Sequence, residues 1–184
     1  RTTVQQNIIA LEILKDCNIK VEIGLILIEP FTTVEEFIEN LNFLEETAFF
    51  DIADITQRFI SSSCMLISIP GTRMHEMLAK EGVETKANEL GYLFNDKRME
   101  TIYTFLRQWE NETKPYAEKR FLIYKAMAEH DKVLVEKLTK WYKEMLKEDF
   151  RYLKDLANAV KNREIDENNL NYITERGKKR FSMI

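Results

Sequence analysis

Residues 24 to 46, GLILIEPFTTVEEFIENLNFLEE, decide the predicted fold because they join an apolar run to an amphipathic segment. From Ile23 to Ile28 every position is apolar except Gly24. Near-continuous apolarity is typical of a strand that is covered on both faces, as in a parallel sheet. Thr33 and Glu36 form a capping box, and apolar residues then recur at helical spacing. The stretch therefore predicts a buried strand followed directly by a helix.

The flanking segments repeat this alternation. A helix is predicted over residues 3 to 16 with Thr3 as its cap, and a second β-rich run, SSCMLISI, spans residues 62 to 69. Thr72 can cap a further helix that Gly82 would end. Helices between strands predict a parallel sheet with right-handed crossovers. Two strands are too few for a stable sheet, so this half is either the last part of a larger α/β fold or pairs with another chain.

The pattern changes at about residue 96, where helical periodicity takes over. Four further helical segments are predicted, over residues 95–113, 114–131, 132–162 and 164–181, with the basic ERGKKR at 175–180 interpreted as a frayed tail. The predicted fold class is thus α/β followed by all-α, the last strand–helix units of a partial TIM-type barrel plus a C-terminal helical bundle. The predicted domains are residues 1–95 and 96–184.

Composition narrows the class of protein. Five Gly and three Pro in 184 residues argue against an all-β fold. Residues 1 to 71 hold 4 Lys/Arg and 11 Asp/Glu, a balance of −7, which disfavours nucleic-acid binding; residues 72 to 184 hold 23 and 20. No apolar run approaches the roughly 18 residues of a membrane span. The opening RTTVQQN lacks a secretory core, and its first residue, Arg, is what a processed protein or a cut fragment would show.

Cysteine and histidine usage predicts neither disulfides nor a metal site. Cys17 and Cys64 lie far apart and outside any CxxC pair, which is typical of reduced, buried thiols in a cytoplasmic protein. His75 and His130 lack partners at metal-ligand spacing, because HEMLA has no second His. No metal ligand is therefore predicted.

Glu29 is the candidate catalytic residue. In parallel sheets functional groups gather at the carboxyl ends of strands, where Glu29 stands just before Pro30. Strand termination and helix capping explain Pro30, Thr32 and Thr33. They do not explain a carboxylate directly after an apolar run. The alternative is an exposed turn residue. Gly24, inside the predicted strand, marks either close approach of a ligand or a weak point of the strand.

Two blocks of sequence resemble the later part of the radical SAM (S-adenosylmethionine) superfamily barrel, most closely members with a cobalamin-binding domain ahead of it. The first is similar to a G-x-I-x-F-D-P strand followed by T-T, with matches at Gly24, Ile26, Glu29, Pro30, Thr32 and Thr33. The second, ISIPGTRMHEMLAKEGV at 67–83, is similar to the family's closing strand and helix, with matches at Pro70, Gly71, Thr72, Leu78, Glu81 and Gly82. Ile28 and Phe31 depart from the fuller family pattern GxIxGxxE.

The resemblance implies that the parent enzyme uses SAM and a [4Fe–4S] cluster, with cobalamin in its nearest members. It places Gly24 and Ile26 beside the SAM adenine, and Ile67, Ser68 and Ile69 on its other side. The cluster motif CxxxCxxC is absent, so the chain should hold no cofactor alone and should be inactive without the missing N-terminal part of its parent. Self-association through an exposed sheet edge is a further expectation.

Two other hypotheses stay open. The long amphipathic segments after residue 96 also suit a non-enzymatic helical protein-interaction module with a small α/β cap. The strand-end motifs would equally suit a fragment of another TIM-like barrel.

Overall fold

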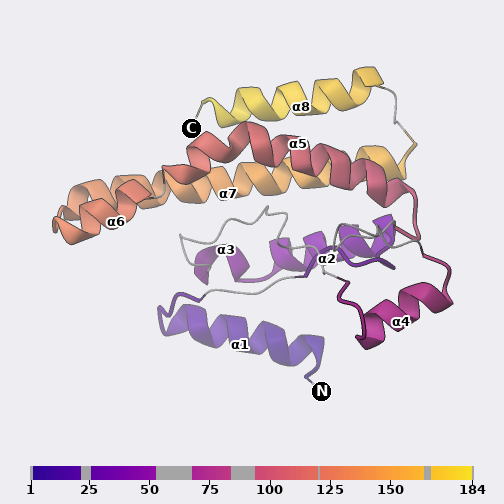
Figure 1. Cartoon of the computed structure of the whole chain (residues 1–184). Helices are drawn as coiled ribbons and strands as arrows, with labels where there is room; N and C mark the ends of the chain where they lie inside the picture. Colours follow the sequence, from indigo (N-terminus) through magenta and orange to yellow (C-terminus); the bar gives the residue numbers. More distant parts are fainter. Residues whose placement is uncertain are drawn as a thin grey trace.

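The computed structural model describes residues 2–21, 26–52, 68–83, 94–119, 121–163 and 167–183, and these ranges contain eight helices (Figure 1). The helices are α1 (Val4–Asp16), α2 (Val34–Glu46), α3 (Phe49–Ile52), α4 (Arg73–Lys80), α5 (Arg98–Glu118), α6 (Phe121–Ala128), α7 (Lys132–Lys161) and α8 (Glu167–Phe181).

The predicted α/β fold, a partial TIM-type barrel followed by helices, is wrong. The described residues are nearly all helical and form no sheet. Val21 and Ile28 each take part in an isolated backbone bridge, and the amide of Val21 donates to the carbonyl of Ile52, at the end of α3 (2.9 Å). Isolated bridges do not make a sheet, which needs consecutive pairs of residues along neighbouring strands. Of the runs interpreted as strands, residues 22–25 and 62–67 lie outside the described residues. At the end of the first run, Leu27 and Ile28 are buried in the core.

The predicted helix starts in the N-terminal half are confirmed. Thr3 and Thr33 each complete a capping box, with the side chains of Gln6 and Glu36 respectively. Thr72 caps α4, and Gly82 follows the end of that helix with a φ of 67°. These features depend on contacts between residues about three positions apart, so the sequence is sufficient to locate them.

Helix α7 is the central element of the fold. Its 30 residues make it ~45 Å long, and it packs against α2, α5, α6 and α8. In Figure 1, α5, α7 and α8 run side by side in an upper layer, while α1, α2, α3 and α4 lie below them. The predicted C-terminal helical bundle therefore forms, but α7 also covers the N-terminal half.

One hydrophobic core joins the two halves of the chain. Phe37 and Leu41 of α2 belong to the same buried cluster as Trp109 of α5 and Leu153 of α7. Between the layers, the rings of Phe50 and Phe150 meet edge to face, 5.1 Å apart. The predicted division near residue 95 falls inside this shared core, and that division remains a prediction.

The basic C-terminal segment is part of α8 and is not a frayed tail. Arg180 donates hydrogen bonds to Glu148 and Asp155 of α7, at 2.7 and 3.2 Å. Gly177 lies so close to α5 and α7 that an added Cβ would stand 2.9 Å from the Trp109 ring. Within this segment Arg180 ties α8 to α7 and Lys178 pairs with Glu112 of α5, whereas Lys179 stays exposed.

Candidate functional site

Glu29 lies at the surface, immediately before α2. Its backbone N–H donates to the hydroxyl of Thr32 (3.0 Å), and its carbonyl accepts from the N–H of Thr32 (3.1 Å). These bonds occupy the backbone of Glu29 and leave its side chain exposed. No hydrogen bond or ion pair joins the Glu29 carboxylate to the residues that the structure describes. It is therefore accessible to a partner or ligand, as a candidate site residue must be.

The residues predicted to line a cofactor are only partly described. Gly24 and Ile67 lie outside the described residues, whereas Ile26 and Ile69 are 61% and 53% exposed. The Ile69 carbonyl already accepts two hydrogen bonds from Thr72, at 2.7 Å from the hydroxyl and 3.1 Å from the N–H. Ser68 is buried, and its hydroxyl lies 3.1 Å from Nδ1 of His75. Of the two described residues of this second segment, Ser68 is buried and the Ile69 side chain is exposed.

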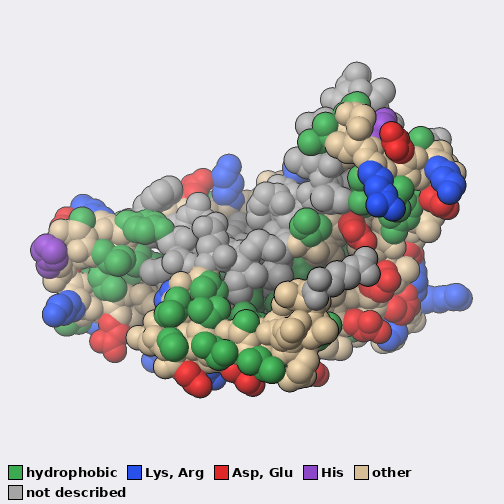
Figure 2. Space-filling view, turned by 90° about the horizontal axis from the view of Figure 1, so that it is seen from below, with side chains coloured by type: hydrophobic (Ala, Val, Ile, Leu, Met, Phe, Trp, Pro, Cys, Tyr) green, Lys and Arg blue, Asp and Glu red, His purple; other side chains and the backbone are tan. Residues whose placement is uncertain are grey.

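Helix α1 is unusual because none of its residues is buried. On one side it is held to α3 by contacts and by an ion pair between Lys15 and Asp51 (2.6 Å). Elsewhere on the helix Val4, Ile9 and Ile13 are 64%, 45% and 57% exposed. Figure 2 shows hydrophobic side chains gathered along this lower face of the molecule. Ile9 and Ile13 lie one helical turn apart on the same side of α1, and we call these two residues the α1 surface.

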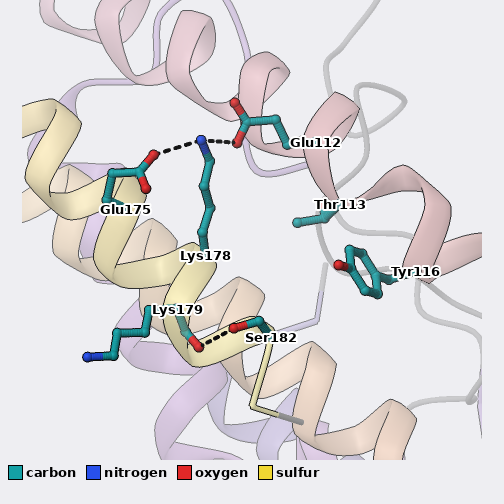
Figure 3. A pocket seen from close by; sticks show the side chains of 7 residues that line it. All are labelled: Glu112, Thr113, Tyr116, Glu175, Lys178, Lys179 and Ser182. Carbon is teal, nitrogen blue, oxygen red and sulfur yellow. Dashed lines mark hydrogen bonds and ion pairs between the residues drawn. The ribbon is translucent and has the colours of Figure 1, made fainter.

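A pocket that the sequence did not indicate lies between α5 and α8, with a volume of about 700 Å³. Figure 3 shows the side chains that line it. They are Glu112, Thr113, Tyr116, Glu175, Lys178, Lys179 and Ser182. At its edge the Lys178 ammonium lies 2.9 Å from Glu175 and 3.0 Å from Glu112.

The electrostatics of this pocket suit helix pairing better than catalysis. Hydrogen bonds to Glu175 and then Glu112 raise the pKa of Lys178, so the ammonium stays protonated at neutral pH. A protonated amine is neither a nucleophile nor a general base. The two carboxylates offset the charge of Lys178 and so weaken the pocket as an anion site. The interaction joins α5 to α8 at the surface.

Sequence reasoning missed this pocket for a physical reason. Its walls come from segments about 60 residues apart, and neither carries a motif that names a ligand. The available signal was the run Lys178, Lys179 and Arg180, which sequence alone could not distinguish from a solvated tail. Among the described residues no group of three or more His, Cys, Asp or Glu side chains is placed to hold a metal ion.

Comparison with known proteins adds no assignment. No protein family, curated protein or solved structure matches this chain. Within the described residues, no helix combines the length and apolar character that crossing a membrane requires.

Proposed function

We propose that this chain supplies the C-terminal part of a radical SAM enzyme and that its α1 surface docks against the part of that enzyme that carries the cluster. In this proposal the chain alone binds no [4Fe–4S] cluster and cleaves no SAM. The parent enzyme supplies CxxxCxxC and the bulk of the SAM site, and cobalamin belongs to it where it has a cobalamin domain.

The observation that carries the proposal is that no residue of α1 is fully buried and that Ile9 and Ile13 are exposed at 45% and 57%. This helix is well capped and rich in apolar residues, yet Ile8, Leu11 and Leu14 are only partly buried and its other apolar residues are exposed. A helix that is apolar on more than one side is normally covered. The surrounding region is acidic, with a balance of −7 over residues 1 to 71. A partner with an apolar centre and basic rim would complement it.

The two blocks that resemble the family give the docking region its proposed role. Ile26 precedes Glu29 in the first block, and Ile69 belongs to the second. Both isoleucine side chains are more than half exposed, and Glu29 is exposed beside the start of α2. These three residues could contact SAM or substrate once the missing part is in place. The resemblance supports this role. The role does not require this chain to form barrel strands.

Reconstitution tests the proposal directly. The 184-residue chain is mixed with a separately produced segment of its parent that carries CxxxCxxC, and formation of 5′-deoxyadenosine from SAM is measured under reducing conditions. Activity is expected only when both parts are present. Formation of a stable cluster on the 184-residue chain alone, after treatment with iron and sulfide, would overturn the proposal.

A variant with a matched control locates the docking surface. The double change Ile9→Glu and Ile13→Glu places two charges on the α1 surface and should weaken association of the parts at least about tenfold. Met127→Glu, at a 51% exposed position on α6, should leave association unchanged. If both variants associate normally, the α1 surface is not the docking site.

The second candidate function is a non-enzymatic helical interaction module. The same unburied helix favours it, because a docking helix needs no cofactor. The two functions differ in one readout. A module should bind its partner without any SAM-dependent reaction in the reconstituted complex, whereas the enzyme part should restore one.

A further inference from the structure

A second pocket lies on α7, beside the residues that follow α8, and has a volume of about 450 Å³. Its lining is Lys137, Lys140, Trp141 and Glu144 of α7, together with Met183. The four α7 positions follow one another at the spacing i, i+3, i+4 and i+7, so they share one face of the helix. We call this hollow the α7 pocket. Its volume lies within the range of about 300 to 1,000 Å³ that is usual for small-molecule sites.

Two ammonium groups at the α7 pocket are open to a ligand. Lys137 and Lys140 are both exposed, and no hydrogen bond or ion pair joins either ammonium to the residues that the structure describes. The carboxylate of the lining, Glu144, lies 2.7 Å from the ammonium of Lys147, which offsets its charge. The pocket therefore presents two cations to one bound molecule. Lysine ammonium groups are common partners of phosphate, and two of them match its double negative charge.

The larger pocket, between α5 and α8, offers less to a ligand because more of its polar groups are engaged within the protein. Lys178 is held between two carboxylates. The hydroxyl of Ser182 donates to the carbonyl of Lys179 (2.9 Å), and the hydroxyl of Thr113 donates to the carbonyl of Trp109 (2.7 Å). Recognition needs polar groups that can turn to the ligand, so the smaller pocket is the better candidate.

The α7 pocket also offers an aromatic surface. Trp141 is partly buried, packs against the hydrophobic core and lines the pocket. Met183, which is 78% exposed, adds a flexible apolar side chain to the lining. Aromatic side chains bind nucleic-acid bases by stacking, and they accept any base because every base has a π face. An indole beside two cations therefore suits a molecule that has both a planar ring and a phosphate.

We propose that the α7 pocket binds a small molecule in which a planar aromatic ring is joined to a phosphate, the class to which nucleoside monophosphates belong. The ring stacks on Trp141, and the ammonium groups of Lys137 and Lys140 donate hydrogen bonds to the phosphate. The site uses neither the α1 surface nor Glu29, so it is independent of the proposed function.

Isothermal titration calorimetry of the full 184-residue chain with adenosine monophosphate (AMP) tests the proposal. AMP should bind at least about tenfold more tightly than adenosine, which lacks the phosphate, and than inorganic phosphate, which lacks the ring. The double change Lys137→Gln and Lys140→Gln should weaken AMP binding at least about tenfold. Lys80→Gln with Lys161→Gln removes the same charge from two exposed positions outside the pocket and should leave binding unchanged. Circular dichroism should show the same helicity in all three proteins.

Fluorescence locates the bound molecule. The chain has two Trp residues, and Trp109 is completely buried, so an iodide quencher in solution reports mainly on Trp141. Saturating AMP should protect Trp141 from iodide in the wild type. Absence of AMP binding, equal affinity for adenosine, equal binding by the double Lys137 and Lys140 variant, or unchanged iodide quenching in saturating AMP would each overturn the proposal. Binding of a single-stranded oligonucleotide without binding of AMP would also overturn it and assign the pocket to nucleic acid.

Discussion

The indole Nε1 of Trp109 donates a 2.8 Å hydrogen bond to Oδ1 of Asp149, and neither side chain is exposed to solvent. This bond joins α5 to α7 in the middle of the helical layer. A buried carboxylate depends strongly on its hydrogen-bond donors. The pair is therefore a main determinant of how the two helices align.

Replacing Trp109→Phe keeps an aromatic ring but removes this donor. We expect the free energy of unfolding to fall by about 2 to 4 kcal/mol, from the lost donor to a buried carboxylate together with the lost ring volume. Urea denaturation measures the change. A second variant, Asp149→Asn, and the double variant complete a cycle, which should show coupling of the two positions. Strictly additive losses would contradict the assigned bond.

Gly177→Ala should destabilise the protein although alanine is the better helix former. A Cβ at residue 177 would lie 2.9 Å from the Trp109 ring and 3.1 Å from the Tyr152 ring, and both rings are completely buried. Overpacking of this kind costs roughly 1 to 3 kcal/mol, against a gain in helix propensity of about 1 kcal/mol. Thermal denaturation measures the net loss. Lys179→Ala, exposed on the same helix, should be nearly neutral.

Alkaline pH should remove the stabilisation that Tyr152 contributes while its buried hydroxyl is protonated. Its ring stacks on Trp109 at 4.1 Å, and burial raises the pKa of its hydroxyl to about 12. Because the folded pKa lies above the unfolded value of 10.0, this contribution is complete below pH 10 and is lost as the pH rises toward 12. Unfolding free energies of wild type and Tyr152→Phe should therefore converge over that range. Tyr172→Phe, at a 63% exposed position, should show no such convergence.

Acid should weaken the contact between α2 and α5 through Arg98. The Arg98 guanidinium donates to Asp96 and Glu35, and these hydrogen bonds lower the pKa of each carboxyl. A carboxyl whose pKa is lowered by folding stabilises the protein above its unfolded pKa, which is 3.8 for Asp96 and 4.5 for Glu35. This stabilisation is lost as the pH falls through the pKa of the folded state. The Arg98→Met variant should lack this acid-dependent part.

The size of that effect is limited by solvent. Arg98 and Glu35 are 38% and 47% exposed, so screening reduces the loss in Arg98→Met at pH 7 to roughly 1 kcal/mol. Urea denaturation at pH 7 and at a pH below 3.8 should show this full difference at the higher pH and a smaller one at the lower. Lys97→Met, which removes a more exposed pair with Glu100, is the matched control. An equal difference at both pH values would contradict the pKa shifts.

The features that could be predicted from the sequence are those set by neighbouring residues. Thr33 and Glu36 act within one helical turn, so the start of α2 was predictable from their spacing alone. The conformation of the apolar run before Glu29 could not be predicted in this way, because a short apolar segment becomes a strand only when a distant backbone pairs with it. Here Leu27 and Ile28 enter the core while Ile26 stays exposed.

Contacts between helices could not be predicted from local sequence patterns either. The stripe on α7 predicted a packing surface, but not that α2 would occupy part of it. The pairing of Arg180 with Glu148 joins residues 32 positions apart, and no spacing rule identifies such a pair. In the candidate site, the position of Glu29 before a helix was predictable, whereas the double acceptance by the Ile69 carbonyl was not.

Glu29→Gln separates a role in folding from a role in the proposed enzyme. The side chain is exposed and its carboxylate contacts none of the described residues, so the change should alter the free energy of unfolding by less than about 0.5 kcal/mol. In the reconstituted enzyme the same change should lower the rate of substrate turnover. Glu36→Gln, in the α2 capping box, is the control; it should cost some stability and leave turnover unchanged. Normal turnover in Glu29→Gln would make Glu29 a turn residue and remove the only catalytic candidate drawn from the sequence.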